Sequence, residues 1–415
     1  MKKINFNYGE FIYTEKLNNG INVYLYPTNK SKNFYATVST HFGAEVMKYK
    51  KGSKVHDVTK GSAHFLEHRV MDFTKNKEAA KKINELGSMV NAYTTYNGTN
   101  YNIFGTEDIF TNLTLLFDRV FKANIRKEDV ESERGIILEE YYMYESDPYY
   151  KAQTTIFKNL FNESFLKYTV LGTEEGIKTV TQEELNRLYK DFYTPNNMFI
   201  VVTGKFDKDE VLKFIKEYMN TININKSNAK VIKPKEKEEV YSKYEEITLE
   251  VNEPKVVIGY KINISKMKDK LKTRLCLEML LSENFDKTGK SFLRLIDNNI
   301  PRFEYSVEEC DNYLIVYFTA STSEHKLFNK IVDEELESLD FTLESLNRKK
   351  KSLISGLILQ FEDIINVEDT ITSNLLMYNK VINNMESIVK SVTLRDIKNI
   401  LNLININNKS LLIEK

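Results

Sequence analysis

Two histidines and a glutamate near residue 65 have the types and the spacing to hold a metal ion. Residues 61–68 read GSAHFLEH and contain two of the five histidines in the 415-residue chain. On a helix, His64 and His68 are four positions apart and share a face, so both imidazoles can converge on one ion. Glu67 points close to the same spot and suits a base beside the metal. The alternative is a helix whose histidines form a surface pair or are satisfied core residues.

A catalytic zinc ion takes three protein ligands and keeps one position open, so a third ligand must come from elsewhere in the chain. The segment ESERGIILEEYYMYE offers Glu133 and Glu140, which are seven positions apart. On a helix these two side chains share a face, so one could bind the metal while the other orients the site from further out. Glu139 is the neighbouring candidate, and the alternative for all three is a solvated acidic helix face.

The elements around these residues alternate between strand-like and helix-like patterns. Two β-rich runs flank Asn19-Gly20, which predicts a hairpin, and residues 33–43 supply a third strand. Helices are expected over 61–73, 76–87, 107–123 and 127–145, with strands at 88–95 and 99–105. A helix from 181 to 193 and a strand from 197 to 204 follow, and Thr181 and Glu184 have capping-box spacing. These patterns predict the α+β class, with mainly antiparallel sheets packed against helices.

The length predicts two domains, because a single hydrophobic core rarely grows to 415 residues. We place a zinc-binding catalytic domain at residues 1–225 and a second α+β domain, without a repeat of the histidine motif, at residues 247–415. The charged segment 226–246, which contains a proline and few apolar residues, is predicted to be the linker.

The composition excludes several partner classes. Lys+Arg and Asp+Glu both total 59, so the balance of charge favours neither nucleic acid nor an anionic membrane. No apolar run reaches the roughly 18 residues of a membrane helix, and the N-terminus lacks the apolar core of a secretory signal. Cys276 and Cys310 have no CxxC spacing, which suits buried thiols in a reducing compartment. We therefore expect a cytoplasmic protein without membrane insertion.

With these motifs in this order, the chain resembles the insulinase and pitrilysin-type zinc peptidases, whose H-x-x-E-H order is called inverzincin. It is most similar to the short branch typified by the mitochondrial processing peptidase and its bacterial relatives. GSAHFLEH resembles the zinc helix of the family, NELGSMVNAYTT its Gly-x-x-Asn-Ala-x-Thr strand, and ESERGIILEEYYMYESDP its glutamate helix. The segment 170–207 follows the next landmarks in order, whereas the second half resembles the family only in layout.

The resemblance implies one Zn²⁺ per chain, bound by His64, His68 and Glu140, with Glu67 as the general base. Glu133 matches an outer acidic position that supports the site. A slightly short spacing from His68 to Glu140 suggests a trimmed loop near residues 71–78.

Substrate contacts are implied less firmly. Asn91, Ala92 and Tyr93 match the edge strand along which the family lays its extended peptide substrate. Arg294 and Tyr305 are candidates for contacts to the substrate carbonyl near the cut, and a structural role for both is the alternative.

The resemblance implies a zinc endopeptidase that cleaves peptides or unfolded segments, in peptide maturation or clearance. Short chains of the family pair to enclose a chamber, so we expect a homodimer or a heterodimer with a related sister subunit. The alternative function is a catalytically inactive structural or partner subunit of a peptidase-like complex. A metal site used for another reaction has no supporting feature in the sequence.

Overall fold

The computed structural model describes residues 1–6, 8–72, 77–224, 226–248 and 253–415. The chain divides into two compact units, and each is assembled from separate stretches of sequence. Unit 1 comprises Met1–Tyr142, Thr169–Lys233 and Leu357–Asn384. Unit 2 comprises Met143–Tyr168, Pro234–Gly356 and Met385–Lys415.

Unit 1 is built on a 7-stranded sheet that is antiparallel except where β3 pairs with β9. The predicted hairpin at Asn19-Gly20 joins β2 to β3. In spatial order the strands are β1 (Lys2–Asn5), β2 (Phe11–Lys16), β3 (Asn22–Pro27), β9 (Met198–Gly204), β4 (Phe34–Thr40), β8 (Thr99–Gly105) and β7 (Met89–Thr94).

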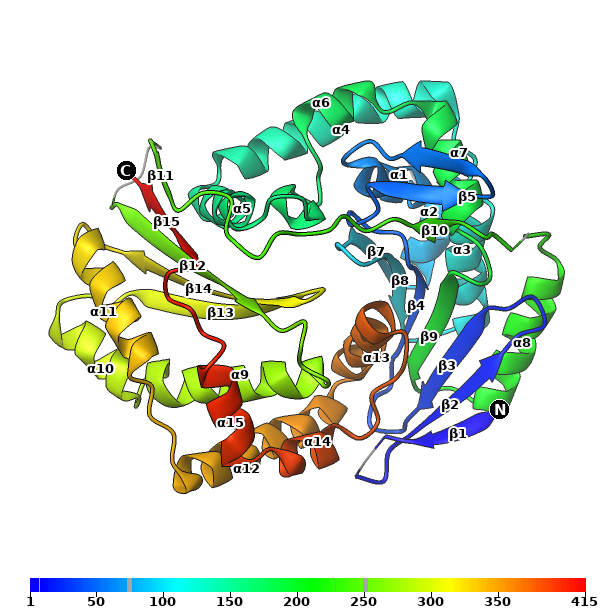
Figure 1. The fold of residues 1–415 in the computed structure, drawn as a ribbon. Helices are drawn as coiled ribbons and strands as arrows, with labels where there is room; N and C mark the ends of the chain where they lie inside the picture. The colour runs from blue at the N-terminus through cyan, green and yellow to red at the C-terminus, as the bar shows by residue number, and fades with distance from the viewer. Residues whose placement is uncertain (7, 73–76, 225, 249–252) are drawn as a thin grey trace. The chain divides into compact units, whose positions relative to one another are not determined.

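Helices cover both faces of this sheet. The side chains of β9 show this, because successive residues of a strand point to opposite faces. Ile200 and Val202 belong to the large core shared with α1 (Ser62–Val70), α3 (Ile109–Phe121), α7 (Gln182–Phe192) and α8 (Lys208–Asn220). Phe199 and Val201 face the other way, into a smaller core with α13 (Ile364–Tyr378). The sheet is therefore the middle of three layers, and α13, orange in Figure 1, covers the face opposite to α1, α3, α7 and α8.

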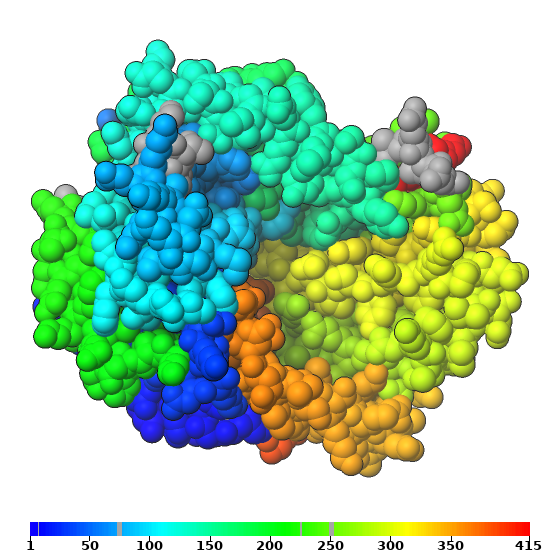
Figure 2. Space-filling model, turned by 180° about the vertical axis from the view of Figure 1, so that it is seen from behind, coloured from blue at the N-terminus to red at the C-terminus, as the bar shows by residue number. Residues whose placement is uncertain are grey.

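The remaining elements of unit 1 surround these layers. α2 (Lys77–Glu85) packs on α3, and the two lie side by side on the surface in Figure 2. α4 (Lys127–Ser146) begins in unit 1, and the short α6 (Glu174–Thr179) contacts α1. A 3-stranded sheet has the order β10 (Lys230–Val231), β5 (Lys48–Lys51) and β6 (Lys54–Asp57).

Unit 2 contains a 5-stranded sheet that is also mainly antiparallel. Its order is β11 (Tyr244–Ile247), β15 (Lys409–Glu414), β12 (Lys255–Asn263), β14 (Tyr313–Ser321) and β13 (Phe303–Cys310). Around it lie α5 (Pro148–Leu160), α9 (Lys270–Phe285), α10 (Lys290–Asp297), α11 (His325–Glu337), α14 (Met385–Ser391) and α15 (Leu394–Leu401), while α12 (Leu343–Leu359) reaches the boundary of the unit. The predicted α+β class, with two mainly antiparallel sheets packed with helices, is confirmed.

The compact units differ from the predicted continuous domains in two exchanged segments. α5 precedes the predicted boundary but packs on β12 and β15 of unit 2, where Gly259 lies against its Ile156 and Leu160 side chains. α13 follows the boundary but covers the open face of the unit 1 sheet, and Thr203 donates to the Ile364 carbonyl oxygen at 2.9 Å. Each of these two helices covers an apolar sheet face that the segments next to it in the sequence do not cover.

The segment predicted to be a linker, 226–246, is more ordered than a solvated connector. Its first part forms β10 and pairs with β5, and its end enters β11. Glu236 lies 2.7 Å from the fully buried Lys261 ammonium group and accepts hydrogen bonds from the main chain at 162–164. Lys233, Glu236 and Glu246 of this segment therefore form ion pairs with residues outside it.

Three other predictions bear on these elements. The trimmed loop near residues 71–78 includes residues 73–76, which lie outside the described residues. Both cysteines are free thiols and buried, as predicted, and burial raises the pKa of Cys276 to about 12. Within the described ranges, no helix combines the length and the apolar character that crossing a bilayer would need.

Candidate metal centre

The helix α1 carries His64, Glu67 and His68 into the interior of unit 1. Its apolar side chains Phe65 and Leu66 are buried in the main core, so the histidine face is fixed by packing on the opposite side. His68 is in the last turn of the helix, where a positive side chain complements the helix dipole. The side chain of His64 is 10% exposed and that of His68 is 23% exposed.

The start of α1 is fixed by two glycines. Gly61 has φ 94°, and a Cβ there would lie 2.4 Å from the main-chain oxygen of Leu171. Gly172 has φ 88° and is equally close to the main chain at Lys60. Only glycine accepts both the positive φ and the close approach, so the loop at 171–172 sets where the metal helix begins.

α4 supplies the two predicted glutamates from one helix face. Glu140 Oε2 lies 3.7 Å from His64 Nε2 and 3.4 Å from His68 Nε2. The ligand atoms of these three residues all lie within 4.8 Å of one another. Glu139 is exposed, so the structure brings Glu140, rather than its neighbour, to the histidines.

Glu133 lies two helical turns before Glu140 on α4, and it contacts the other ring nitrogen of His68. Its Oε1 is 3.0 Å from His68 Nδ1, and its Oε2 accepts a hydrogen bond from Arg69. With Nδ1 protonated and bonded to Glu133, Nε2 of His68 is the nitrogen left to bind a metal. Glu133 therefore contacts a candidate ligand, and its predicted place among the catalytic residues stays a prediction.

In the metal-free site the pKa values of the two histidines are shifted in opposite directions. Burial, together with the nearby charge of His68, lowers the pKa of His64 to about 4 against the attraction of Glu140. Burial also opposes a charge on His68, but hydrogen bonds to Glu133 and Glu140 and the charge of Glu67 raise its pKa to about 9. The hydrogen bond from His68 lowers the pKa of Glu140. Binding a cation must therefore displace a proton from His68.

Glu67 faces the same space but is held separately from the ligand atoms. Thr94 Oγ1 donates to Glu67 Oε2 at 2.7 Å. Burial raises the pKa of Glu67, and the hydrogen bond from Thr94 pulls it back down. A buried carboxylate with a raised pKa and one oriented oxygen suits a group that must accept and return a proton.

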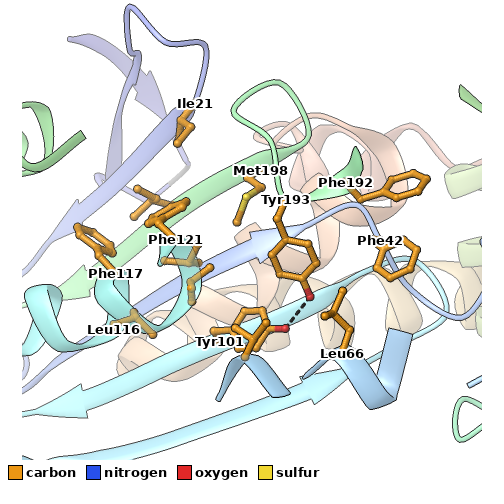
Figure 3. Packing of buried hydrophobic residues seen from close by; sticks show 14 of the residues in the cluster. Ile21, Phe42, Leu66, Tyr101, Leu116, Phe117, Phe121, Phe192, Tyr193 and Met198 are labelled. Carbon is orange, nitrogen blue, oxygen red and sulfur yellow. Dashed lines mark hydrogen bonds between the residues drawn. The ribbon is translucent and has the colours of Figure 1, made fainter. Parts of the chain in front are cut away.

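A buried tyrosine pair shares the core with the apolar side chains of α1. Tyr101 and Tyr193 join hydroxyl to hydroxyl at 2.6 Å, and Figure 3 shows the two rings pointing toward each other beside Leu66. Phe42 stacks on Phe192 with ring centroids 4.7 Å apart, at the same end of the cluster. Burial raises the pKa of Tyr101 well above its usual range, so the pair stays neutral beneath Glu67.

The predicted substrate strand is β7. In the described part of the chain β7 pairs on one side only, with β8, so its other edge is open. The Ala92 amide donates to the Asn91 side-chain oxygen at 2.9 Å. Ala92 packs against the main core, whereas Tyr93 is half-buried and burial raises its pKa. Thr94 follows directly, so this strand also reaches the proposed base.

Arg294 and Tyr305 lie in unit 2, where contacts within that unit account for both. Arg294 donates to Glu335 Oε1 at 2.7 Å and also pairs with Glu334. Tyr305 donates to Asp286 Oδ1 at 2.8 Å. These contacts are those expected of the structural alternative, and a role in substrate binding stays a prediction.

Two residues of the site were missed by the sequence reasoning, Thr94 and Arg69. Thr94 stands two positions after Ala92, so strand alternation places both on the same face of β7. That signal was available, because the sequence already places 88–95 in a strand. Arg69 follows His68 directly, and nothing in its spacing indicates a contact with Glu133, 64 positions away.

The donor set fits zinc. Two imidazole nitrogens and one carboxylate oxygen converge here, and a catalytic zinc site takes three protein ligands of these kinds and keeps a fourth position open. The hydrogen bond from His68 Nδ1 to Glu133 supplies the outer contact that such histidines usually have.

Comparisons with known proteins agree with this site. The family model described as Insulinase (Peptidase family M16) matches residues 47–174, which contain the three candidate ligands and Glu67. The model described as Peptidase M16 inactive domain matches residues 179–353. The chain therefore belongs to the insulinase family of peptidases, and the description "inactive" attaches to the part that lacks the histidine motif.

Individual relatives carry the name zinc protease. The chain is 29% identical over 299 residues to the uncharacterized zinc protease YmfH of Bacillus subtilis (strain 168), covering 69% of this chain and 68% of YmfH. It is 28% identical over 232 residues to the zinc protease PqqL of Escherichia coli (strain K12), covering 52% of this chain but 24% of PqqL. The names of these relatives do not establish an activity for this chain, so an activity can only be proposed from them.

The fold also matches solved structures. An M16-like peptidase from Alicyclobacillus acidocaldarius superimposes with a TM-score of 0.91 over 99% of both chains, at 21% sequence identity. At that identity the likeness establishes the fold, and it does so across both units.

Proposed function

We propose that this chain is a zinc-dependent endopeptidase that cleaves peptides or unfolded segments. The observation that carries the proposal is the convergence of His64, His68 and Glu140, with ligand atoms within 4.8 Å of one another and Glu67 directed to the same space. One zinc ion per chain, held by these three residues, would lower the pKa of a water molecule and polarise the carbonyl of the bond to be cut.

In this mechanism Glu67 acts first as the general base and then as the general acid. Its Oε2 is fixed by the Thr94 hydroxyl, so the carboxylate is held in place when it accepts the proton of the attacking water. The same group returns the proton to the amine of the departing peptide. Burial, which raises its pKa, favours both steps because the protonated form is not too costly to populate.

The open edge of β7 is where an extended substrate would bind. A peptide can add to this edge as a further strand, with main-chain hydrogen bonds fixing its register. Pairing would replace the internal contact from the Ala92 amide to Asn91. Because Thr94 on β7 touches Glu67, a peptide aligned on this strand would pass close to the base. The proposed substrate is therefore a chain without stable structure of its own.

We further propose that the chain works as a dimer, with a second copy or a related sister chain that closes a chamber. This rests on the resemblance to short chains of the family, and sedimentation at several protein concentrations tests it. A purely monomeric protein that cleaves peptide at full rate would contradict it. Maturation or clearance of small peptides in the cytoplasm stays a prediction, and PqqL is described as periplasmic.

The direct test of Glu67 is its replacement by glutamine, which keeps the size and the Thr94 contact but removes the base. Glu67→Gln is expected to lose at least ~100-fold of peptide cleavage while binding zinc normally. Glu139→Gln is the matched control, because Glu139 is an exposed glutamate on α4 beside the ligand, and it should keep full activity. Undiminished turnover by Glu67→Gln would remove Glu67 from the mechanism.

A further inference from the structure

We propose that Arg69 is a positioning residue of the metal centre. Its guanidinium holds the carboxylate of Glu133 so that this carboxylate accepts the Nδ1 proton of His68 and leaves Nε2 directed at the metal. This inference rests on the zinc site proposed above, and it assigns a role to a residue outside the H-x-x-E-H pattern.

The contacts form a chain of three side chains. Arg69 Nη1 donates to Glu133 Oε2, and the other oxygen of the same carboxylate, Oε1, is 3.0 Å from His68 Nδ1. The side chain of Arg69 is 4% exposed and that of Glu133 is 15% exposed. Because both oxygens are engaged at once, the carboxylate cannot turn without breaking a contact to one partner.

Arg69 is itself held from two further directions. Its Nη2 pairs with Asp72, and its Nη1 also lies 3.4 Å from the main-chain oxygen of Asp129. The planar guanidinium can serve these groups together, whereas a lysine ammonium is a single point charge on a flexible stem. Arg69 thus joins the end of α1 to α4, the two helices that supply the ligands.

His64, the other proposed histidine ligand, is held differently. Among the described residues, Nδ1 of His64 is buried and finds no hydrogen-bond partner. His64 therefore depends on packing for its orientation, and His68 depends on Glu133 and Arg69. The effect of removing Arg69 should accordingly pass through His68 alone.

A neighbouring cavity supplies a matched control. It has a volume of about 230 Å³, and Arg69, Arg119, Lys122 and Arg126 are among the residues that line it. Each of these cations lies beside an acidic group or a carbonyl oxygen, so the cavity carries no excess of unpaired positive charge. Arg119, in the same cavity, donates to the main-chain oxygen of Asp72 at 2.8 Å, whereas Arg69 pairs with the side chain of that residue and with Glu133.

The experiment measures the zinc dissociation constant by competition with a chromophoric chelator. Arg69→Met and Glu133→Gln are each expected to weaken zinc binding by roughly 10- to 100-fold, the usual effect of losing an outer contact. The double variant should bind no more weakly than Glu133→Gln alone, because Arg69 acts through Glu133. Arg119→Met should stay within about twofold of the unaltered protein.

A general loss of stability would give a different pattern. Thermal unfolding of the metal-free variants reports the structural effect separately, and Arg69→Lys, which keeps the charge, serves if Arg69→Met does not fold. Arg69→Lys should weaken zinc binding at least about threefold in the unaltered background and have no effect beside Glu133→Gln.

Two results would overturn the role of Arg69: zinc affinity unchanged when Arg69 is replaced, or losses that simply add to those of Glu133→Gln. These outcomes are distinct from failure of the proposed function. If the unaltered protein binds no zinc, the enzyme proposal fails, and if it binds zinc normally while Arg69 proves irrelevant, only the present inference fails.

Discussion

Within the candidate centre, two of the reactive side chains, Glu67 and His68, are each held by a second residue. Thr94 fixes Glu67, and Glu133 fixes His68. The second contacts come from β7 and α4, which the sequence alone does not bring to α1. The reactive residues could be predicted because their spacing is local, with two histidines one turn apart and two glutamates seven apart. Their fixing contacts could not, because they depend on how close separate elements approach.

Removing the Thr94 hydroxyl should slow catalysis without disturbing the metal. Thr94→Val keeps the shape of the side chain but leaves Glu67 without its 2.7 Å donor. We expect the turnover number to fall by about 10-fold at unchanged zinc content, because an unoriented base transfers protons less efficiently. Steady-state kinetics with a quenched peptide measure this. Thr94→Ser keeps the hydroxyl and should recover most of the rate; if serine and valine behave alike, the hydrogen bond is unimportant.

Among the elements, α1 begins at a glycine with positive φ, and α13 carries a fully buried carboxyl group, Glu368. The sequence pattern predicts a helix at 61–73, which contains α1. It does not reveal that α13 returns to cover the unit 1 sheet or that α5 leaves for unit 2. Many helices have an apolar stripe, and only the completed sheets determine which face each stripe covers.

Gly61→Ala should both destabilise unit 1 and weaken zinc binding. The new Cβ would lie 2.4 Å from the Leu171 oxygen at a φ of 94°, so the start of α1 must move. Backbone strain alone costs about 1–3 kcal/mol. The control is Gly52→Ala, where φ is also positive but nothing lies within 4 Å. It should lose some thermal stability and keep its zinc affinity. Equal zinc affinity in both variants would show that the contact at residue 171 does not position the site.

Glu368 on α13 should make stability fall as pH rises. It is fully buried, and burial raises its pKa to about 8, with Asp369 adding repulsion. Tyr35 and Tyr93 on the sheet below feel the same charges. An unfolded glutamate loses its proton near pH 4.3, so between there and pH 8 the folded chain binds more protons. Stability therefore declines across that window, by up to about 1.4 kcal/mol per pH unit.

Urea unfolding midpoints at a series of pH values from 5 to 8 check this. Glu368→Gln removes the titrating group, so its midpoint should decline less with pH than that of the unaltered protein. Glu362→Gln is the control, because that side chain is 68% exposed and should leave the decline unchanged. Parallel midpoint curves for Glu368→Gln and the unaltered protein would be incompatible with a buried proton on Glu368.

Across the whole molecule, both units are α+β, and the proposed chemistry is confined to one of them. All three candidate ligands and the proposed base lie in unit 1, whereas unit 2 holds Arg294 and Tyr305 in contacts of its own. The fold class could be predicted, since strand and helix patterns alternate in both halves. The division of the chain could not, because a charged stretch such as 226–246 has the same composition whether it is solvated or paired in β10 and β11.

The most direct measurement is the zinc content of the purified protein, by elemental analysis, with cleavage of a quenched unstructured peptide by the same sample. We predict about one zinc per chain and cleavage that a chelator abolishes. His68→Ala should lose both, and His325→Ala, which removes a half-buried histidine of unit 2, should lose neither. A zinc-free protein that cleaves the peptide, or equal zinc in His68→Ala and the unaltered protein, would contradict the assigned metal centre.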